Sequence, residues 1–345
     1  MGFRLSLLLL SFFLTIFTFI PFINLLYKWK LQRKKQETKD VFQKPTPIFD
    51  KLHRLKAGTP VGGGLLVIFA TVILFLFSFI AQYYFWIPIT SVYQNRGSEI
   101  KILLFTFIAF GILGLYDDVR KTFFTEGENF FGLRLRHKLI LEIFLSLVVG
   151  FWLFTELKIS IIHIPLLGVF EIGILFIPFA AFVIIAFSNA FNITDGLDGL
   201  ASGLLMIAIS AFWVVAASIL DTPISNFIAI WIGALIAFLY FNIYPARIFL
   251  GDVGSLSFGA TLAVIGLMTG KVFSLVIIGG LFVAEVGSSL LQILTKKFVG
   301  KKLFKVAPLH LLLQEAGWPE SKVVMRGWIT GIILAILGLW LALVR

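Results

Sequence analysis

Apolar runs of about 20 residues recur along the whole sequence, and this feature limits the fold more than any other. Residues 5–27, the first such run, contain no charged side chain. Only 14% of all residues are charged, whereas soluble domains carry about 25%, so polar groups could not cover a soluble surface. The sequence therefore predicts an all-α polytopic membrane protein, with residues 1–345 forming a single integral-membrane domain.

The hydropathy pattern predicts ten spanning helices. An even number of spans places both termini on the same side of the membrane. In the pairs 200–241 and 254–295 the pattern leaves open a re-entrant segment in place of two spans. The predicted spans are 5–27, 62–86, 101–116, 138–156, 172–188, 200–220, 226–241, 254–270, 272–295 and 326–344.

Lysine and arginine are distributed unevenly between the two sides of this predicted bundle. The odd-numbered connections carry 23 of the 29. Because cytoplasmic loops are enriched in these residues, we expect the odd-numbered connections to face the cytoplasm and both termini to lie outside. The formal net charge of +11 then reflects topology and attraction to anionic lipid headgroups, and nucleic acid is not needed to explain it.

The polar clusters with chemical potential all fall on the predicted cytoplasmic side. Asp117 and Asp118 are adjacent at the end of the third span. They could simply be solvated at a helix end, or a divalent cation or a proton could relieve the repulsion between the two carboxylates. Asn189, Asn192 and Asp195 follow the fifth span at i, i+3 spacing, which places them on one face of a continuing helix. Asp198 follows, between glycines that permit a turn or a close approach to a ligand, and this stretch favours a functional site.

Four further residues, on that side or within the membrane, are candidates for a functional site, and each could also have a structural role. Asp252 begins the eighth span, where it could be a helix cap or a magnesium ligand. His310 stands in a short polar break, although a lone histidine is more often structural. Lys56 precedes a glycine-rich turn whose N–H groups could meet a phosphate. Glu285 lies within the ninth span, where an ionisable group indicates function or pairing.

Acids, cations and a histidine at the inner membrane surface suit diphosphate chemistry, in which charge neutralisation does much of the catalysis. A site at membrane level suggests one lipid substrate and one substrate from the cytosol. The residues alone therefore predict a metal-dependent enzyme acting on phosphates at the cytoplasmic leaflet.

Four stretches carry a family resemblance over nearly the whole chain: "DDVRK", "NAFNITDGLDGLASG", "FNIYPARIFLGDVGS" and "APLHLLLQEAGWPESKVVMRGWI". They resemble the polyprenyl-phosphate sugar-1-phosphate transferases (glycosyltransferase family 4), and within them the phospho-N-acetylmuramoyl-pentapeptide transferases. The resemblance implies a bacterial inner-membrane enzyme, often dimeric. It would use Mg²⁺ to transfer phospho-N-acetylmuramoyl-pentapeptide from its UDP conjugate to undecaprenyl phosphate, yielding lipid I and UMP.

The resemblance also implies roles for individual residues. Asp117 and Asp118 match a catalytic aspartate pair, Asp252 a magnesium ligand, and His310 a catalytic histidine. Asp117 and Asp118 are further candidates for the metal. Positions matching contacts to the nucleotide or the phosphates are Lys56, Lys121, Lys138, Asn192, Asp195, Asp198, Asn242 and Phe249.

The sequence departs from the muramoyl pattern at several positions. Where that branch has three consecutive histidines, this chain has His310, Leu311 and Leu312, and the usual glutamine after Lys138 is Glu142. Val61 and Gln314 replace a usual threonine and a usual acid. These departures keep open a related enzyme that uses UDP-N-acetylglucosamine or another UDP-N-acetylhexosamine. A transporter of a phosphorylated solute and a silent lipid-phosphate-binding homologue are two further alternatives.

Overall fold

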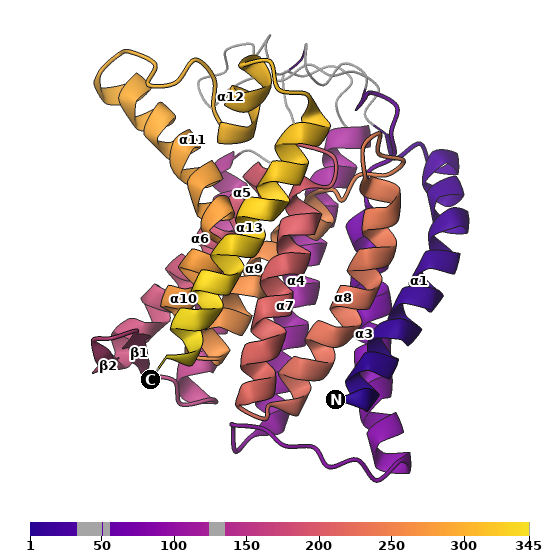
Figure 1. The fold of residues 1–345 in the computed structure, drawn as a ribbon, viewed down its shortest axis with the longest axis vertical. Coiled ribbons are helices and arrows are strands. Elements are labelled where there is room, and N and C mark those ends of the chain that lie inside the picture. The colour runs from indigo at the N-terminus through magenta and orange to yellow at the C-terminus, as the bar shows by residue number, and fades with distance from the viewer. Residues whose placement is uncertain (33–49, 51–55, 124–134, 345) are drawn as a thin grey trace.

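The protein is a bundle of helices, seen in a computed structural model that describes residues 1–32, 50, 56–123 and 135–344 (Figure 1). A two-stranded antiparallel hairpin, β1 (Ile161–Ile164) and β2 (Gly168–Glu171), joins two of the helices. The described helices are α1 (Gly2–Lys28), α3 (Gly63–Tyr84), α4 (Arg96–Phe123), α5 (Leu135–Thr155), α6 (Phe176–Thr194), α7 (Leu200–Ser218), α8 (Thr222–Asn242), α9 (Asp252–Met268), α10 (Val272–Ile278), α11 (Gly280–Phe298), α12 (Leu309–Glu315) and α13 (Glu320–Leu343).

The polytopic all-α architecture is confirmed, with a difference in the span count. Among the described residues, eight helices are long and apolar enough to cross a membrane, and nine if the bent pair α10 and α11 counts as one span. The remaining predicted span, 254–270, corresponds to α9, an apolar helix of 17 residues. The pair 200–241 is two full helices, α7 and α8, so it contains no re-entrant segment.

Burial patterns show which helices face lipid. The buried residues of α1 follow one another at intervals of three or four, as expected for a helix that packs along one stripe and exposes the rest; they are Leu7, Ser11, Thr15, Phe19, Ile23 and Leu26. Helix α8 is buried on nearly all sides, and its Ile230 carbonyl accepts a 2.7 Å hydrogen bond from Ser11 of α1. Helix α8 therefore lies inside the protein, with α1 on its lipid side.

Helix α9 lies in the middle of the bundle and brings the polar segments together. Every residue from Val253 to Met268 is buried, against α4, α6 and α3. The approach is close because glycines stand at the crossings: a Cβ at Gly64 would collide with Gly254, and one at Gly114 would collide with the backbone of Asp252. The end of α4, which carries Asp117, therefore meets the first residue of α9.

Three predicted spans have different ends or shapes. Helix α4 continues to Phe123 and α6 to Thr194, past the predicted ends at 116 and 188, because the polar side chains beyond those points bind within the protein. The predicted span 272–295 is a bent pair of helices: α10 and α11 meet at 79°, which fits either a broken span or the re-entrant segment left open for the pair 254–295. After the bend, α11 leaves the bundle and buries only Phe282 and Glu285 (Figure 1).

Both termini lie at the same end of the bundle (Figure 1), as the predicted even number of spans implies. The hairpin of β1 and β2 lies toward that end, and α12 lies at the opposite end. The assignment of these ends to the outside and the cytoplasm stays a prediction.

Candidate active site

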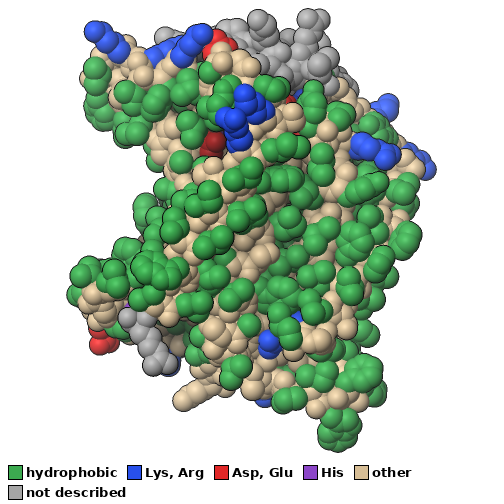
Figure 2. Space-filling model, in the orientation of Figure 1, with side chains coloured by type: hydrophobic (Ala, Val, Ile, Leu, Met, Phe, Trp, Pro, Cys, Tyr) green, Lys and Arg blue, Asp and Glu red, His purple; other side chains and the backbone are tan. Residues whose placement is uncertain are grey.

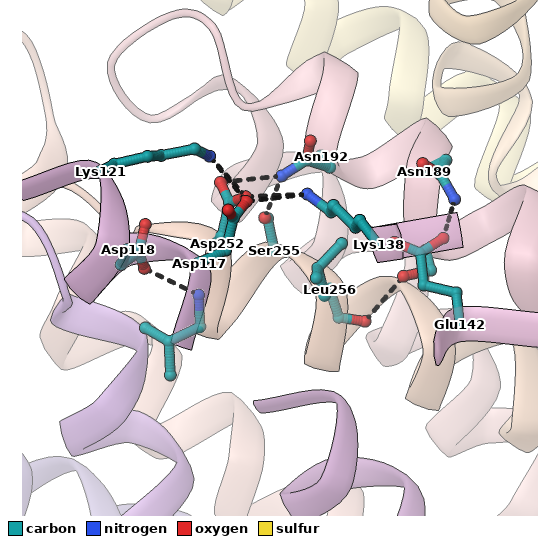
Figure 3. Close-up of polar contacts among 12 residues, drawn as sticks. Asp117, Asp118, Lys121, Lys138, Glu142, Asn189, Asn192, Asp252, Ser255 and Leu256 are labelled. Atoms are coloured by element: carbon teal, nitrogen blue, oxygen red, sulfur yellow. Dashed lines mark hydrogen bonds and ion pairs between the residues drawn. The ribbon is translucent and has the colours of Figure 1, made fainter. Parts of the chain in front are cut away.

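Two aspartates and two lysines from three helices meet at the end of the bundle that carries α12 (Figure 3). Oδ2 of Asp252, on α9, accepts hydrogen bonds of 2.8 Å from both Lys121 of α4 and Lys138 of α5. The same two ammonium groups lie 2.9 and 3.5 Å from Oδ2 of Asp117. Because each carboxylate contacts both cations, two like charges can lie side by side in a largely buried cluster.

Asp118 and Asn192 fix the start of α9 from either side. Oδ2 of Asp118 accepts a 3.0 Å hydrogen bond from the backbone N–H of Val253, one of the N–H groups that a helix start leaves without an internal partner. Asn192 of α6 donates to Oδ1 of Asp252 at 3.2 Å and to the hydroxyl of Ser255 at 2.6 Å. Asp118 therefore holds the α9 backbone, whereas its neighbour Asp117 contacts the lysines.

The polar row on α6 extends along one side of this cluster. Because α6 remains helical to Thr194, Asn189 and Asn192 project from one face. Asn189 donates to the buried carboxylate of Glu142 on α5 (Figure 3). Asp195, half-buried just after α6, has its pKa raised to about 7 by burial and then by the negative charge of Asp252.

A second charged group holds the turn between α6 and α7. Nζ of Lys56 lies 2.7 Å from Oδ1 of Asp198 and 2.6 Å from Oε1 of Glu320, the first residue of α13. The same Glu320 oxygen accepts from the backbone N–H of Asp198 at 2.7 Å, and Trp328 of α13 donates to the carbonyl of Gly199 at 3.1 Å. Helix α13 therefore holds both the turn and Lys56.

Of the two other predicted nucleotide contacts, Asn242 touches this turn and Phe249 lies beside the glycine-rich turn that follows Lys56. Asn242 is buried, and its amide is engaged by the backbone: Oδ1 accepts from Gly199 and Nδ2 donates to Ile248. Phe249 is partly exposed, and its carbonyl accepts from Gly62 and Gly63, so the glycine-rich turn lies beside it. Asn242 therefore holds the turn through its amide group, and Phe249 remains partly exposed to solvent.

His310 is fixed by Glu285, across the gap between α12 and α11. Glu285 accepts from the His310 backbone N–H at 3.1 Å and lies 3.0 Å from ring Nδ1. Ring Nε2 is directed at Gly196, where a Cβ would collide with it. The pairing predicted for Glu285 is confirmed, and it turns the second ring nitrogen toward the turn that follows α6.

Comparisons with known proteins decide the family. Residues 100–270 match the sequence model of glycosyl transferase family 4. The phospho-N-acetylmuramoyl-pentapeptide-transferase of Borrelia turicatae is 36% identical over 347 residues, which cover 95% of this chain and 92% of that protein. The protein of the same name from Clostridium novyi is 35% identical over 295 residues, 85% of each chain. This chain belongs to the phospho-N-acetylmuramoyl-pentapeptide-transferase family. The resemblance predicted from the sequence is thus confirmed, and the transferase class with it.

One of the positions named above as a departure, Leu311, is buried beside His310. Leu311 is 3% exposed and packs in the core at the start of α12. Position 311 therefore contributes packing to the hydrophobic interior, and His310 is the imidazole of this segment that lies against Gly196.

Sequence reasoning missed Glu320, which ties Lys56 to the backbone of Asp198. The signal was present in "GWPES", where a proline precedes an acid at a helix start. An acid there is expected for the helix dipole alone, so the local pattern gave no reason to connect it with a lysine 264 residues away.

The donor atoms fit a magnesium ion that takes most of its ligands from substrate. Among the described residues, no three acid or histidine side chains converge as a complete ligand set. Asp117 and Asp252 nevertheless supply hard carboxylate oxygens side by side, and Mg²⁺ is commonly held by one or two carboxylates with phosphate oxygens and water. The cluster therefore fits the ion as part of a substrate complex.

Proposed function

We propose that this protein transfers phospho-N-acetylmuramoyl-pentapeptide from its UDP conjugate to undecaprenyl phosphate, releasing UMP and forming lipid I. The observation that carries the proposal is the cluster of Asp117, Lys121, Lys138 and Asp252. Two lysines can bind the oxygens of a diphosphate, and the two acids beside them hold the lysines in place. The names of the family members suggest the donor substrate.

The transfer needs one bond to form and one to break at the sugar-side phosphorus of the donor. An oxygen of the lipid phosphate attacks that phosphorus, and the bond to the UMP oxygen breaks with its electron pair. Lys121 and Lys138 would neutralise the charge that collects on the diphosphate oxygens, an effect that accounts for much of phosphoryl-transfer catalysis. Asp117, held by both lysines, would orient the incoming lipid phosphate.

The nucleotide would bind at the turn after α6. Phe249 is a partly exposed residue beside the glycine-rich turn that follows Lys56, and a uracil could stack on its ring. Lys56 and Asp198 offer a cation and a carboxylate that are already fixed by Glu320. Asn192 on α6 and Asp195 just after its end would line the path of the diphosphate between this turn and the cluster.

Magnesium would be held by Asp252 and Asp117, with Asp118 supporting the start of α9. When bound, the ion supplies positive charge to the diphosphate oxygens. His310, with ring Nε2 at the turn, would hold a proton or a phosphate oxygen near the donor. The active face would look into the bacterial cytoplasm from the inner membrane, and the protein would act as a homodimer.

The test offers purified protein undecaprenyl phosphate and magnesium with each UDP-sugar in turn, and measures UMP. We expect UMP from UDP-N-acetylmuramoyl-pentapeptide, its loss on chelation of magnesium, and its loss in Asp252→Asn, which should still elute as a folded species in detergent. Release with the N-acetylglucosamine donor alone would assign the related hexosamine transferase instead. No release with either donor would overturn the enzymatic proposal.

A further inference from the structure

A lysine-rich segment with exposed apolar side chains comprises the end of α11 and the residues that follow it. Residues 296–305, here called the basic hook, contain five lysines: Lys296, Lys297, Lys301, Lys302 and Lys305. Between them, Phe298, Val299 and Leu303 are 74%, 66% and 52% exposed. Figure 2 shows Lys and Arg side chains along the upper left rim, with hydrophobic side chains beneath them. The proposed function uses none of these residues.

The basic hook has a defined conformation. The side chain of Gln292 on α11 accepts from the backbone N–H groups of Leu303 and Phe304 at 3.0 and 2.9 Å and donates to the Phe304 carbonyl at 2.9 Å. Gly300 allows the chain to reverse, with φ of 73°. The hook therefore folds back on α11 and presents Lys301 and Lys302 to the outside.

The position of α11 places the basic hook at the membrane surface. Helix α11 leaves the bundle after the 79° bend, and Leu290, Leu291 and Leu294 on it are about half exposed, at 53%, 50% and 46%. In a membrane protein such a row is covered by acyl chains. Lys296 and Lys297 belong to the last turn of α11 and the other three lysines follow it, so all five would lie at the level of the lipid headgroups.

We propose that the basic hook is a docking surface for anionic phospholipid headgroups. The charges are complementary, because the hook carries lysines and the headgroups carry phosphate. Phe298, Val299 and Leu303 would enter the interface while the ammonium groups stay among the phosphates, as lysine side chains do at membrane surfaces. Lys305 is already paired with Glu315 of α12 at 2.6 Å, so Lys301 and Lys302 are the principal contacts.

Docking would bear on the active site through a short connection. His310, on α12, lies five residues after the end of the hook and is held by Glu285 of α11, the helix that leads into the hook. A headgroup bound at the hook would therefore contact a segment that continues α11 and leads into the start of α12. The inference does not rest on the proposed reaction, since binding is measured separately from turnover.

The chain contains no cysteine, so Val299→Cys gives a single attachment point for an environment-sensitive fluorophore in the hook. The full-length labelled protein is reconstituted in phosphatidylcholine vesicles with a rising fraction of phosphatidylglycerol. We expect the emission to shift to the blue and iodide quenching to fall as the anionic fraction rises. In K301Q/K302Q the ratio of docked to undocked label should fall about 30-fold, and K301R/K302R should retain docking.

The matched control is K28Q/K30Q, which removes two exposed lysines near the end of α1. This variant should keep the full lipid-dependent shift. The proposal is overturned if the label responds equally in pure phosphatidylcholine, if K301Q/K302Q responds like the parent protein, or if the control abolishes the response as well.

Discussion

The crossing of α4 and α9 at Gly114 gives a quantitative prediction. The Cβ of an alanine at this position would stand 2.0 Å from the carbonyl oxygen of Asp252 and 2.6 Å from the nitrogen of Val253. Both are backbone atoms, so a rotamer change cannot relieve the collision, and α9 must move by about 1 Å to reach an allowed contact. Because a displacement of that size can cost about 100-fold in rate, we expect Gly114→Ala to lower kcat by about two orders of magnitude.

Gly111→Ala is the matched control, one turn earlier on the same helix. Its Cβ would meet the end of the Ile68 side chain at 2.8 Å, with Val253 at 3.7 Å, so the side chain can turn aside and α9 stays in place. UMP release is measured for both variants at saturating substrate, with gel filtration and thermal melting in detergent as measures of folding. The reasoning fails if folded Gly114→Ala keeps kcat within about twofold of the parent, or if Gly111→Ala is impaired equally.

Three further outcomes can be checked on the same preparation. Glu320→Gln weakens the hold on Lys56, so the KM for the UDP donor should rise about tenfold with little change in kcat; an unchanged KM would contradict this. The folded protein retains the Asp195 proton up to about pH 7, whereas the unfolded chain loses it near the ordinary pKa of an aspartate, so the stability of the folded protein falls as the pH rises between these two values. The melting temperature of Asp195→Asn should therefore exceed that of the parent protein by an amount that grows from pH 5 to pH 7 and then levels off. A difference in melting temperature that does not change with pH would refute this. Glu285→Gln should lower kcat by releasing His310, while a fall in melting temperature alone would assign Glu285 a structural role.

The sequence correctly predicted a polytopic membrane protein and the positions of its polar segments, because both follow from residues that are close together in the sequence. Apolar length predicts spans, and the i, i+3 spacing of Asn189 and Asn192 correctly indicates one face of α6. The 79° bend at Gly279 was not predicted, and the contact made there is not a local one: the ring of Phe187 on α6 lies where a Cβ at Gly279 would stand. Likewise the interaction of Glu320 with Lys56 joins the first described connection to the last helix, a contact that no spacing rule reaches.

That interaction has a consequence for how the enzyme comes into being. Lys56 and the turn at 196–199 are synthesised before Glu320 and Trp328, which hold them and belong to the last described helix, α13. A chain that stops short of α13 would carry Asp117, Lys121, Lys138 and Asp252 and still lack the two side chains that hold Lys56 and the turn. We therefore expect such a truncated chain to keep the cluster of acids and lysines without a fixed turn between α6 and α7.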